Sequence, residues 1–520
     1  MGGLLLSLLL VPAAHARASD PTIDSTIDST IDSTIDSTID STIDSTIDSA
    51  IDSAIDSAID SAIDSAIDSA SDPASNIREG RAALADNLPA QARERFAAAL
   101  AQPDISREDR YAAAMGLGQS ALWLGDYPTA TTAFRTAREA AGDATAQQAA
   151  DTGLAQALNA QDYPRAAYAL VAPYAQGQTK PTVELLRAVQ SLGWQDRSTP
   201  YLDAALPPLP QGYLGTQYRL LKDDMQFALA PQLEGNFGYS HDSDGLDTWH
   251  VGAAYRFAPF SRGDWTQRWG VAASTTRVED RKQSRRLDDL SLLGQLRIGD
   301  NHSIDLNLGP GRSGRWHYLQ GMARWTLQPS DSFGLSAGAE RAPVPTDTAV
   351  ANHLIYNLYS VGANFRPAAR WYVLPTYYRQ NFNDGNHRDG GSLRVLLSPY
   401  DVADTRAAIG GEFSARIFHS DRPSHGVYFN PAHYRTAQFG LVGVYSLSPE
   451  WKLRAVASAG RQVVNGAGAG VYTVGLSLEG RLPGNGRLEL QLGRSSAASA
   501  SNGGSGYWNN SMNLVVRYPL

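Results

Sequence analysis

The chain has 520 residues, no cysteine and a formal net charge of −9 at pH 7. Its length predicts two or three structural units. The absence of cysteine excludes a disulfide framework, thiolate metal sites and cysteine catalysis. The longest mostly apolar stretch is residues 4–14, which is too short for a membrane-spanning helix of roughly 20 residues.

A signal sequence is predicted at the N-terminus. Residues 4–14 form an apolar core, and Ala14-His15-Ala16 matches the small-residue pattern of a cleavage site. The usual basic start is absent, which a start codon placed too late would explain. We interpret residues 1–16 as a secretory signal peptide cleaved after Ala16. The alternative is a short buried segment.

The next segment is an acidic repeat tract. Twelve Ile-Asp-Ser units, joined first by Thr and then by Ala, fill residues 22–70. The Ile stripe drifts around a helix by about 40° per unit, and Ser, Thr and Asp favour caps over helix interiors. We therefore interpret residues 17–74 as a disordered tract. Cation binding by the aspartates is the alternative, although the tract lacks the glycine turns of a calcium loop.

The tract also accounts for the negative charge of the chain. Residues 20–72 contain 14 aspartates and no basic residue, and Arg17 is the one basic residue before them. Without these contributions of −14 and +1, residues 73–520 carry a net charge of about +4. A nearly neutral body does not indicate a nucleic-acid partner.

Residues 75–205 are rich in alanine, and their apolar residues follow helical spacing. One stretch matches the tetratricopeptide pattern of two packed helices, through Gly118, Gly125, Tyr127, Ala130, Phe134 and Ala137. Tyr163 and Ala166 repeat part of it 36 residues further on. We predict two to three tetratricopeptide-like repeats, which usually offer a concave surface to partners. A generic bundle of helical hairpins is the alternative.

From about residue 225 the apolar period changes from 3.6 to 2. Trp249, Val251 and Ala253 alternate with His250 and Gly252, and the same alternation recurs along the chain. Sixteen such runs start near residues 232, 248, 268, 288, 302, 316, 333, 353, 370, 391, 405, 435, 451, 471, 487 and 508. Short connections mostly alternate with long ones.

This layout is typical of an outer-membrane β-barrel, in which a closed sheet pairs every backbone polar group. We therefore predict an α+β multidomain chain: helical repeats over 75–205, a linker over 206–224 and a transmembrane antiparallel barrel of about 16 strands over 225–520. An even strand number leaves both barrel ends on the short-turn side, so the repeats would lie in the periplasm. A soluble β-sandwich or propeller is the alternative.

The polar faces of the runs would line the lumen if the apolar faces contact lipid. The candidate pore-lining residues carry both charges and amides: Arg256, Arg297, Asp305, Asn307, Gln320, Arg324, Glu340, Arg394, Glu412, Arg416, Arg454, Glu489, Gln491 and Arg517. A bore of this size admits a solute or an extended polymer. For any single charge, an ion pair that only holds the wall is the alternative.

The sequence gives little indication of catalysis. A hydrolase built on the barrel rim needs Ser, His and an acid together, and His419, Ser424 and His425 in the longest loop are the candidates. That composition is ordinary for an exposed loop, so we predict no enzyme. The histidines show no metal-ligand spacing, and we expect neither a metal nor another cofactor.

Tyr428-Phe429-Asn430-Pro431, followed by Tyr434, resembles the Tyr-Phe-x-Pro segment of the cellulose synthase operon protein C family. These are outer-membrane exopolysaccharide export proteins, and Ala457–Gln462 resembles their following strand end. The order of signal, repeats and barrel is similar too. The chain departs from the family in having fewer repeats and in ending Tyr518-Pro519-Leu520.

The resemblance implies a channel in the bacterial outer membrane that exports an exopolysaccharide, with cellulose or a cellulose-like glucan as the expected polymer. It implies outer-membrane lipid around the barrel. Through the repeats, it also implies contact with an inner-membrane polysaccharide synthase and periplasmic subunits. A general solute porin, or an adhesin or scaffold without transport, is the alternative.

Overall fold

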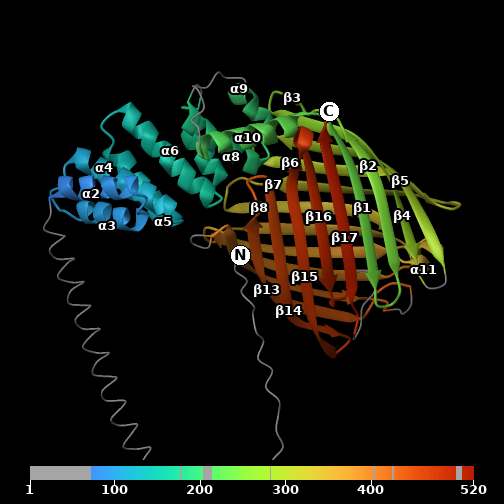
Figure 1. Ribbon diagram of the computed structural model, residues 1–520. Coiled ribbons are helices and arrows are strands. Elements are labelled where there is room, and N and C mark those ends of the chain that lie inside the picture. Colours follow the sequence, from blue (N-terminus) through green and yellow to red (C-terminus); the bar gives the residue numbers. More distant parts are fainter. Residues whose placement is uncertain are drawn as a thin grey trace, which may run out of the picture. The chain divides into compact units, whose positions relative to one another are not determined.

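The computed structural model describes residues 72–175, 178–202, 213–280, 283–401, 405–423, 427–498 and 506–520. The predicted signal peptide, the acidic tract up to residue 71 and residues 206–212 of the predicted linker lie outside this part. The described chain is a helical segment followed by a closed β-barrel (Figure 1). This confirms the predicted fold class.

The helical segment is a series of helices in which each packs against the next. Polar side chains fix where several of them begin: Ser106 accepts the backbone N–H of Asp109, and Asp126 accepts that of Thr129. Among the described residues, no helix has the length and hydropathy needed to cross a bilayer. The elements are α2 (Pro73–Ala85), α3 (Pro89–Leu100), α4 (Arg107–Trp123), α5 (Tyr127–Ala140), α6 (Ala144–Ala160), α7 (Pro164–Val171), α8 (Thr179–Leu192), η1 (Gln195–Ser198), α9 (Thr199–Leu202) and α10 (Tyr213–Leu229).

Phenylalanine rings packed on glycines hold neighbouring helices together. Phe134 of α5 is 1% exposed, and a Cβ added to Gly118 or Gly153 would lie within 2.7 Å of its ring. Ala130 and Ala137 are fully buried beside it. Tyr127 begins α5 directly after the turn at Gly125, whose φ is +71°. The residues chosen for repeat packing thus lie in or beside this interior, while the tetratricopeptide assignment itself stays a prediction.

The structure differs from the expected linker over 206–224 and barrel start at 225. Residues 213–229 form helix α10, and the first strand begins at Gln232. The reason is an apolar stripe at helical spacing, because Tyr218, Leu221 and Met225 are buried in the core of the helical segment. Polar residues lie between these three, so a search for strand-like alternation does not detect the helical stripe.

The described residues of the barrel form sixteen long antiparallel strands and one strand of three residues, β3. All sixteen begin within four residues of their predicted starts. The strands are β1 (Gln232–Asp242), β2 (Asp247–Arg256), β3 (Phe260–Arg262), β4 (Trp265–Glu279), β5 (Ser284–Ile298), β6 (His302–Ser313), β7 (Trp316–Leu327), β8 (Phe333–Pro343), β9 (Ile355–Phe365), β10 (Trp371–Phe382), β11 (His387–Asp401), β12 (Ala407–Ser420), β13 (His433–Ser446), β14 (Trp451–Val464), β15 (Ala467–Leu482), β16 (Gly486–Ser495) and β17 (Asn509–Pro519).

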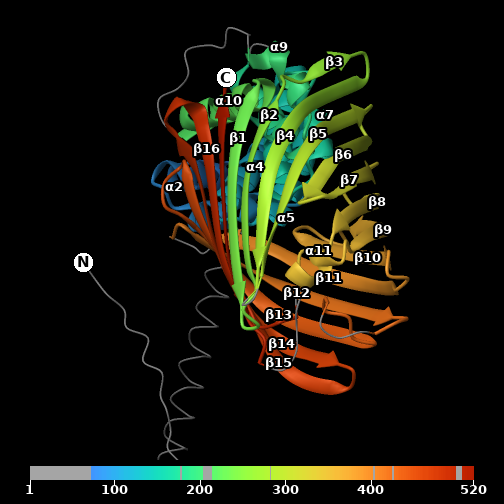
Figure 2. The ribbon, with the colours of Figure 1, turned by 90° about the vertical axis from the view of Figure 1, so that its right-hand side faces the viewer.

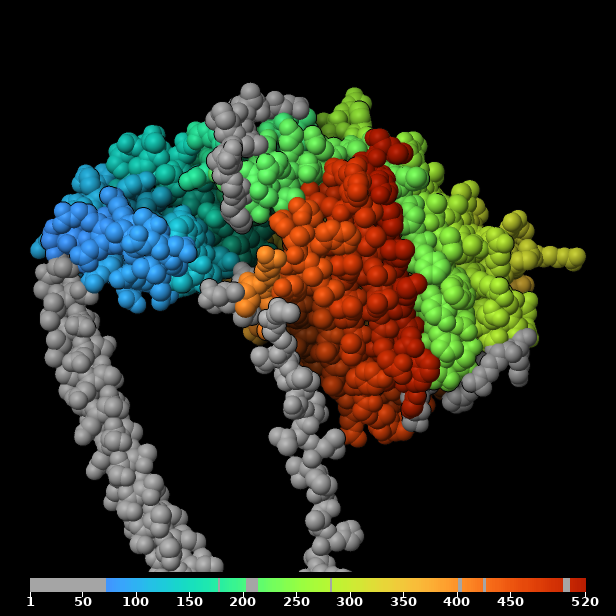
Figure 3. Space-filling view, viewed as in Figure 1, coloured from blue at the N-terminus to red at the C-terminus, as the bar shows by residue number. Residues whose placement is uncertain are grey.

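The sheet closes on itself between its first and last strands. Phe237 of β1 lies opposite Leu514 of β17 on one side and Val251 of β2 on the other. Strands β17 and β1 therefore lie side by side without an open edge (Figures 2 and 3). Closure leaves no row of unpaired backbone groups, which is the condition for a sheet to stand in lipid.

The outward face of the barrel is apolar and exposed. Phe439 is 71% exposed, Leu441 68% and Ile417 59%, although all three are large apolar side chains. A broad exposed apolar surface on a closed sheet is the signature of contact with hydrocarbon. The barrel is therefore transmembrane.

The two ends of the barrel differ. One end carries the short turns, such as residues 299–301, 328–332 and 483–485, and the helical segment contacts this end. The other end carries the three longest connections, after β8, β12 and β16, together with two-residue turns after β6 and β14. The connection between β8 and β9 includes the short helix α11 (Asp347–Ala351) (Figure 1).

Candidate functional site

The register places the predicted pore-lining residues on the inward face. On β12, Glu412 and Arg416 have the opposite phase to the exposed Ile409 and Ile417. Strand pairing carries the same phase around the ring and puts the other twelve candidates inward as well: Arg256, Arg297, Asp305, Asn307, Gln320, Arg324, Glu340, Arg394, Arg454, Glu489, Gln491 and Arg517. Their contact with a transported molecule stays a prediction.

Several of these charged side chains form ion pairs between neighbouring strands on the inner face of the wall. Arg517 donates to Glu234 at 2.7 Å, and Arg256 lies 3.9 Å from the same carboxylate. Arg394 pairs with Glu412 at 2.9 Å. These pairs stabilise the register of the strands and lower the net charge that a solute meets.

Two arginines of the lumen differ from the others. Arg324 and Arg454 are exposed and form no ion pair within the described part of the chain. Their guanidinium groups are thus available to hydroxyl or carboxylate oxygens of a molecule in the bore.

The helical segment is fastened to three short turns on one side of the barrel mouth. In the turn between β5 and β6, the carbonyl of Asp300 accepts from Arg165 at 2.7 Å. In the turn between β7 and β8, Asp331 accepts the backbone N–H of Arg165 at 3.0 Å. Arg366, after β9, donates to the carbonyl of Gln161 at 2.6 Å. Burial lowers the pKa of Arg165, and the carboxylate of Asp331 opposes this shift.

Helix α10 is fastened on the opposite side. Asp224 lies 2.8 Å from Arg481 and 2.7 Å from Arg487, which flank the turn between β15 and β16. In the same turn, Asn485 donates to the carbonyl of Asp223 at 2.9 Å. This turn is eight strands from that between β7 and β8, so the helical segment spans the mouth.

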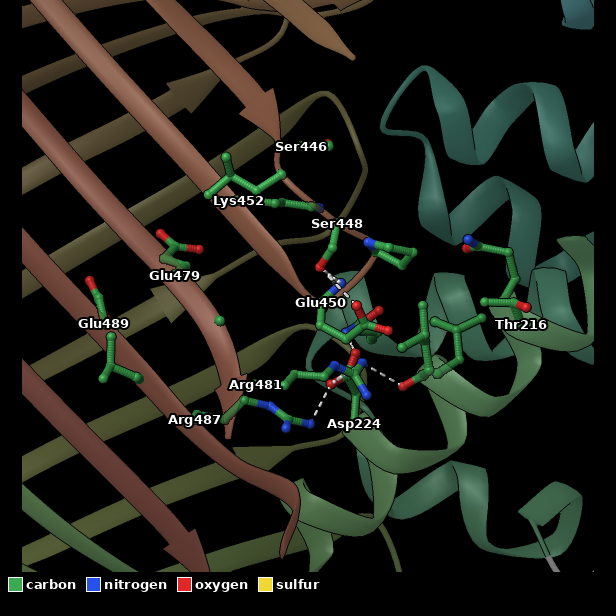
Figure 4. Close-up of a pocket in the computed structure, with 18 of the residues that line it drawn as sticks. Thr216, Asp224, Ser446, Ser448, Glu450, Lys452, Glu479, Arg481, Arg487 and Glu489 are labelled. Atoms are coloured by element: carbon green, nitrogen blue, oxygen red, sulfur yellow. Dashed lines mark hydrogen bonds and ion pairs between the residues drawn. The ribbon is translucent and has the colours of Figure 1, made fainter. Parts of the chain in front are cut away.

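An opening of about 900 Å³ lies between the helices and the barrel wall (Figure 4). Thr216 and Asp224 of α10 line one side, and Glu450 lines another from the turn between β13 and β14. Glu479 and Glu489, which face the lumen, line the same opening. Residues of the helices and residues of the inner wall therefore line the same opening.

A buried carboxyl group stands in α8, next to this opening. Burial raises the pKa of Glu184, while Arg187 at 3.3 Å and a hydrogen bond from Asn159 at 2.9 Å act in the other direction. Arg187 also lines the opening. The partners of the Glu184 carboxyl group thus lie within the helical segment, and the group does not face the solute path.

Two loops fold inward at the other end of the barrel. Val350 of α11 packs against Val278 and Leu287, which project inward from β4 and β5. The same loop meets the loop between β12 and β13, because Thr346 donates to the carbonyl of Val427 at 2.6 Å. Together these two loops narrow the loop end of the lumen.

The segment that carries the family resemblance lies at this constriction. Tyr428 is 4% exposed and its ring stacks on Phe382 with centroids 4.6 Å apart. The carbonyl of Phe429 accepts from Arg388 at 2.6 Å, and Asn430 and Pro431 are buried. Tyr434 begins the inward face of β13 and stacks on Phe418. The sequence motif identified this segment. Nothing in the sequence indicated that it contacts the loop that contains α11.

The catalytic candidates do not form a site within the described residues. His419 projects outward beside His433, with ring centroids 4.8 Å apart, and Ser424 and His425 lie outside the described part. In that part, no cluster of three or more His, Asp or Glu side chains could hold a metal ion.

Solved structures similar to this chain are outer-membrane proteins. The chain is 12% identical to a bacterial polysaccharide outer membrane secretin, over 56% of this chain and 99% of that one, with a TM-score of 0.48. It is 12% identical to OccD3 of Pseudomonas aeruginosa, over 56% and 91%, with a TM-score of 0.33. It is 13% identical to OmpT of Vibrio cholerae, over 56% and 96%, with a TM-score of 0.31.

No protein-family model matches the chain, and no curated protein matches it in sequence. The fold is established by its own geometry: sixteen antiparallel strands, a closed seam, an apolar outer face and a polar lumen. The barrel has the channel-like fold of an outer-membrane protein.

Proposed function

We propose that this protein is an outer-membrane channel that exports a polysaccharide, and that the polymer is cellulose or a cellulose-like glucan. The opening between α10 and the lumen is the observation that carries this proposal, because it gives a chain molecule a path past the helices into the bore. A bore of sixteen strands accommodates an extended polymer.

The two ends of the barrel support the orientation that we propose. Short turns face the periplasm in outer-membrane barrels, so the helical segment lies in the periplasm and the loops around Tyr428 lie outside. The polymer then enters beside α10 and leaves past the constriction. The inner-membrane synthase that makes it supplies the driving force, and the helical segment contacts periplasmic subunits of that system.

The lumen chemistry favours a neutral polymer. Sugar hydroxyls both donate and accept hydrogen bonds, so they match a wall with guanidinium donors such as Arg324 and carboxylate acceptors such as Glu489. A strongly cationic polymer would instead favour a mostly acidic wall. The mixed lumen binds weakly at many places, which lets a polymer slide.

The test is the distribution of glucan in cells that lack residues 225–520. Periplasmic and extracellular fractions are digested with cellulase and the released sugar is measured. We expect glucan in the periplasm and loss of the extracellular fraction. Unchanged extracellular glucan would reject the glucan proposal.

A general solute porin is the second candidate, and the sixteen-strand bore is the observation in its favour. A porin has no use for a helical segment at its mouth. Deleting residues 73–229 should therefore leave the uptake of small sugars intact in a porin, whereas an export channel should lose extracellular polymer.

A further inference from the structure

The outward face of the barrel carries exposed aromatic side chains at both ends, whereas arginines gather on it near the loop end. Near the short turns it carries aromatic side chains, among them Trp265, Trp325, Trp371, Tyr445 and Tyr518. Near the loops it carries arginines on eight of the strands, one each on β4, β5, β6, β8, β10, β13, β14 and β16: Arg277, Arg286, Arg312, Arg341, Arg379, Arg435, Arg461 and Arg494.

Most arginines of this belt have polar partners in the wall. Arg277 lies 2.9 Å from Glu279, and Arg286 lies 2.6 Å from Asp288. Arg435 and Arg461 are different, because both are exposed and, within the described chain, neither has a hydrogen-bond or ion-pair partner.

The strand register places these two arginines on adjacent strands, with the guanidinium of Arg461 over Gly468 of β15. Arg435 lies opposite Val463, and Arg461 lies opposite Ala437, so the two are diagonal neighbours on the outward face. Such neighbours are about 7–8 Å apart. His433 follows on the same face of β13, directly opposite His419. Two like charges at this spacing repel each other unless an anion lies between them.

An apolar groove of about 660 Å³ begins beside Arg435 on the outer wall. Tyr377, Ile417 and Val463 line it, and Gly391 contributes no side chain to its lining. The one carboxylate of the lining, Asp389, is already held by Tyr377 at 2.9 Å and by Arg379 at 3.5 Å.

We propose that this groove and the Arg435–Arg461 pair form a binding site for a phosphate-bearing lipid of the outer leaflet. The acyl chain lies in the groove over Gly391, and the phosphate lies between the two guanidinium groups, which bind phosphate oxygens in pairs. Free phosphate would use the cations but leave the apolar groove empty. The choice of leaflet rests on the proposed orientation, whereas the site itself does not depend on what the channel transports.

The test compares lipid binding by two double variants of the full-length protein in detergent. Native mass spectrometry follows the titration with bisphosphorylated lipid A. We expect R435Q/R461Q to bind this lipid at least about tenfold more weakly than the wild type, since each lost guanidinium–phosphate contact is charge-assisted. The matched control R277Q/R286Q removes two arginines of the same belt that already have partners, and its binding should stay within about twofold of the wild type.

Two further measurements separate a built site from general attraction. Gly391→Leu fills the groove without changing charge and should weaken lipid A binding, while millimolar inorganic phosphate should not displace the lipid. Mobility on unheated gels verifies that each variant has a folded barrel. Equal losses in R435Q/R461Q and R277Q/R286Q, or displacement by inorganic phosphate, would overturn the proposal.

Discussion

The carboxylate of Asp224 in helix α10 lies 2.7 Å from the guanidinium of Arg487 in strand β16. Both side chains are largely buried, with 24% and 18% of their surface exposed. The pair attaches helix α10 to the wall of the barrel. The sequence predicted a linker where this helix lies. The pair therefore contributes to holding α10 at the opening.

Asp224→Asn should loosen α10 from the barrel mouth. The change leaves Arg481 and Arg487 without their shared charge, which we expect to cost about 1–3 kcal/mol of docking free energy. Hydrogen exchange should then become faster in the amides of residues 213–229. Asp223→Asn is the matched control, because that side chain is 49% exposed and makes one longer contact at 3.3 Å. Equal protection of α10 in both variants would contradict the role of Asp224.

Tyr428→Ala should widen the loop end of the lumen. The ring stacks on Phe382, and its hydroxyl accepts from Asn386 at 2.9 Å, so its removal detaches the loop between β12 and β13. We expect a larger single-channel conductance in a planar bilayer. Tyr377→Ala removes a ring of the same type from the outward face and should leave conductance unchanged. A conductance equal to that of the wild type in Tyr428→Ala would place the constriction elsewhere.

Gly153→Val should destabilise the helical segment. A Cβ at this position would lie 2.4 Å from the ring of Phe134, which is 1% exposed. Overpacking of this kind costs about 1–3 kcal/mol. The loss of helical circular dichroism on heating should begin at a lower temperature. Gly142→Val is the control, since a Cβ there meets nothing within 4 Å.

Glu184→Gln should stabilise the helical segment at neutral and higher pH. Burial raises the pKa of Glu184 in the folded chain, so the folded state binds this proton more tightly than the unfolded state. The resulting stability is full below the ordinary pKa of glutamate and is lost as the pH rises through the raised value. Glutamine keeps the acceptor for Asn159 and carries no charge. Thermal melts at pH 4 and pH 8 should therefore differ less in the variant than in the wild type.

The exposed Glu139 supplies the control for this experiment. Glu139→Gln should leave the difference between the two melts as it is in the wild type. A difference in Glu184→Gln as large as that of the wild type would assign the pH dependence to another group.

The strands and their phase could be predicted because each strand reports its own environment. The apolar Trp249 and Val251 alternate with the polar His250, so this short stretch alone indicates which face of the strand contacts lipid. No distant residue is needed for this prediction. The same alternation gave the inward positions of Arg256 and Arg517, since pairing transmits one phase around the whole ring.

The contacts between elements were not predictable in this way. Arg366 meets the carbonyl of Gln161, about two hundred positions earlier in the chain, because the curvature of the sheet brings that turn under the helices. The meeting of Thr346 with Val427 depends equally on closure. Helix α10 is a different case, since Tyr218, Leu221 and Met225 carry a helical stripe that could have been found.

The attachment of the helices on both sides of the mouth has a mechanical consequence. Asp331 and Asp224 hold the helical segment to turns that face each other across the ring, so the cross-section at that end is fixed like the rim of a braced tube. At the loop end, the described residues show only contacts of loops with one another and with the inner wall. Any change in bore diameter during transport should therefore occur at the loop end. The diameter at the end that contacts the helices should stay constant.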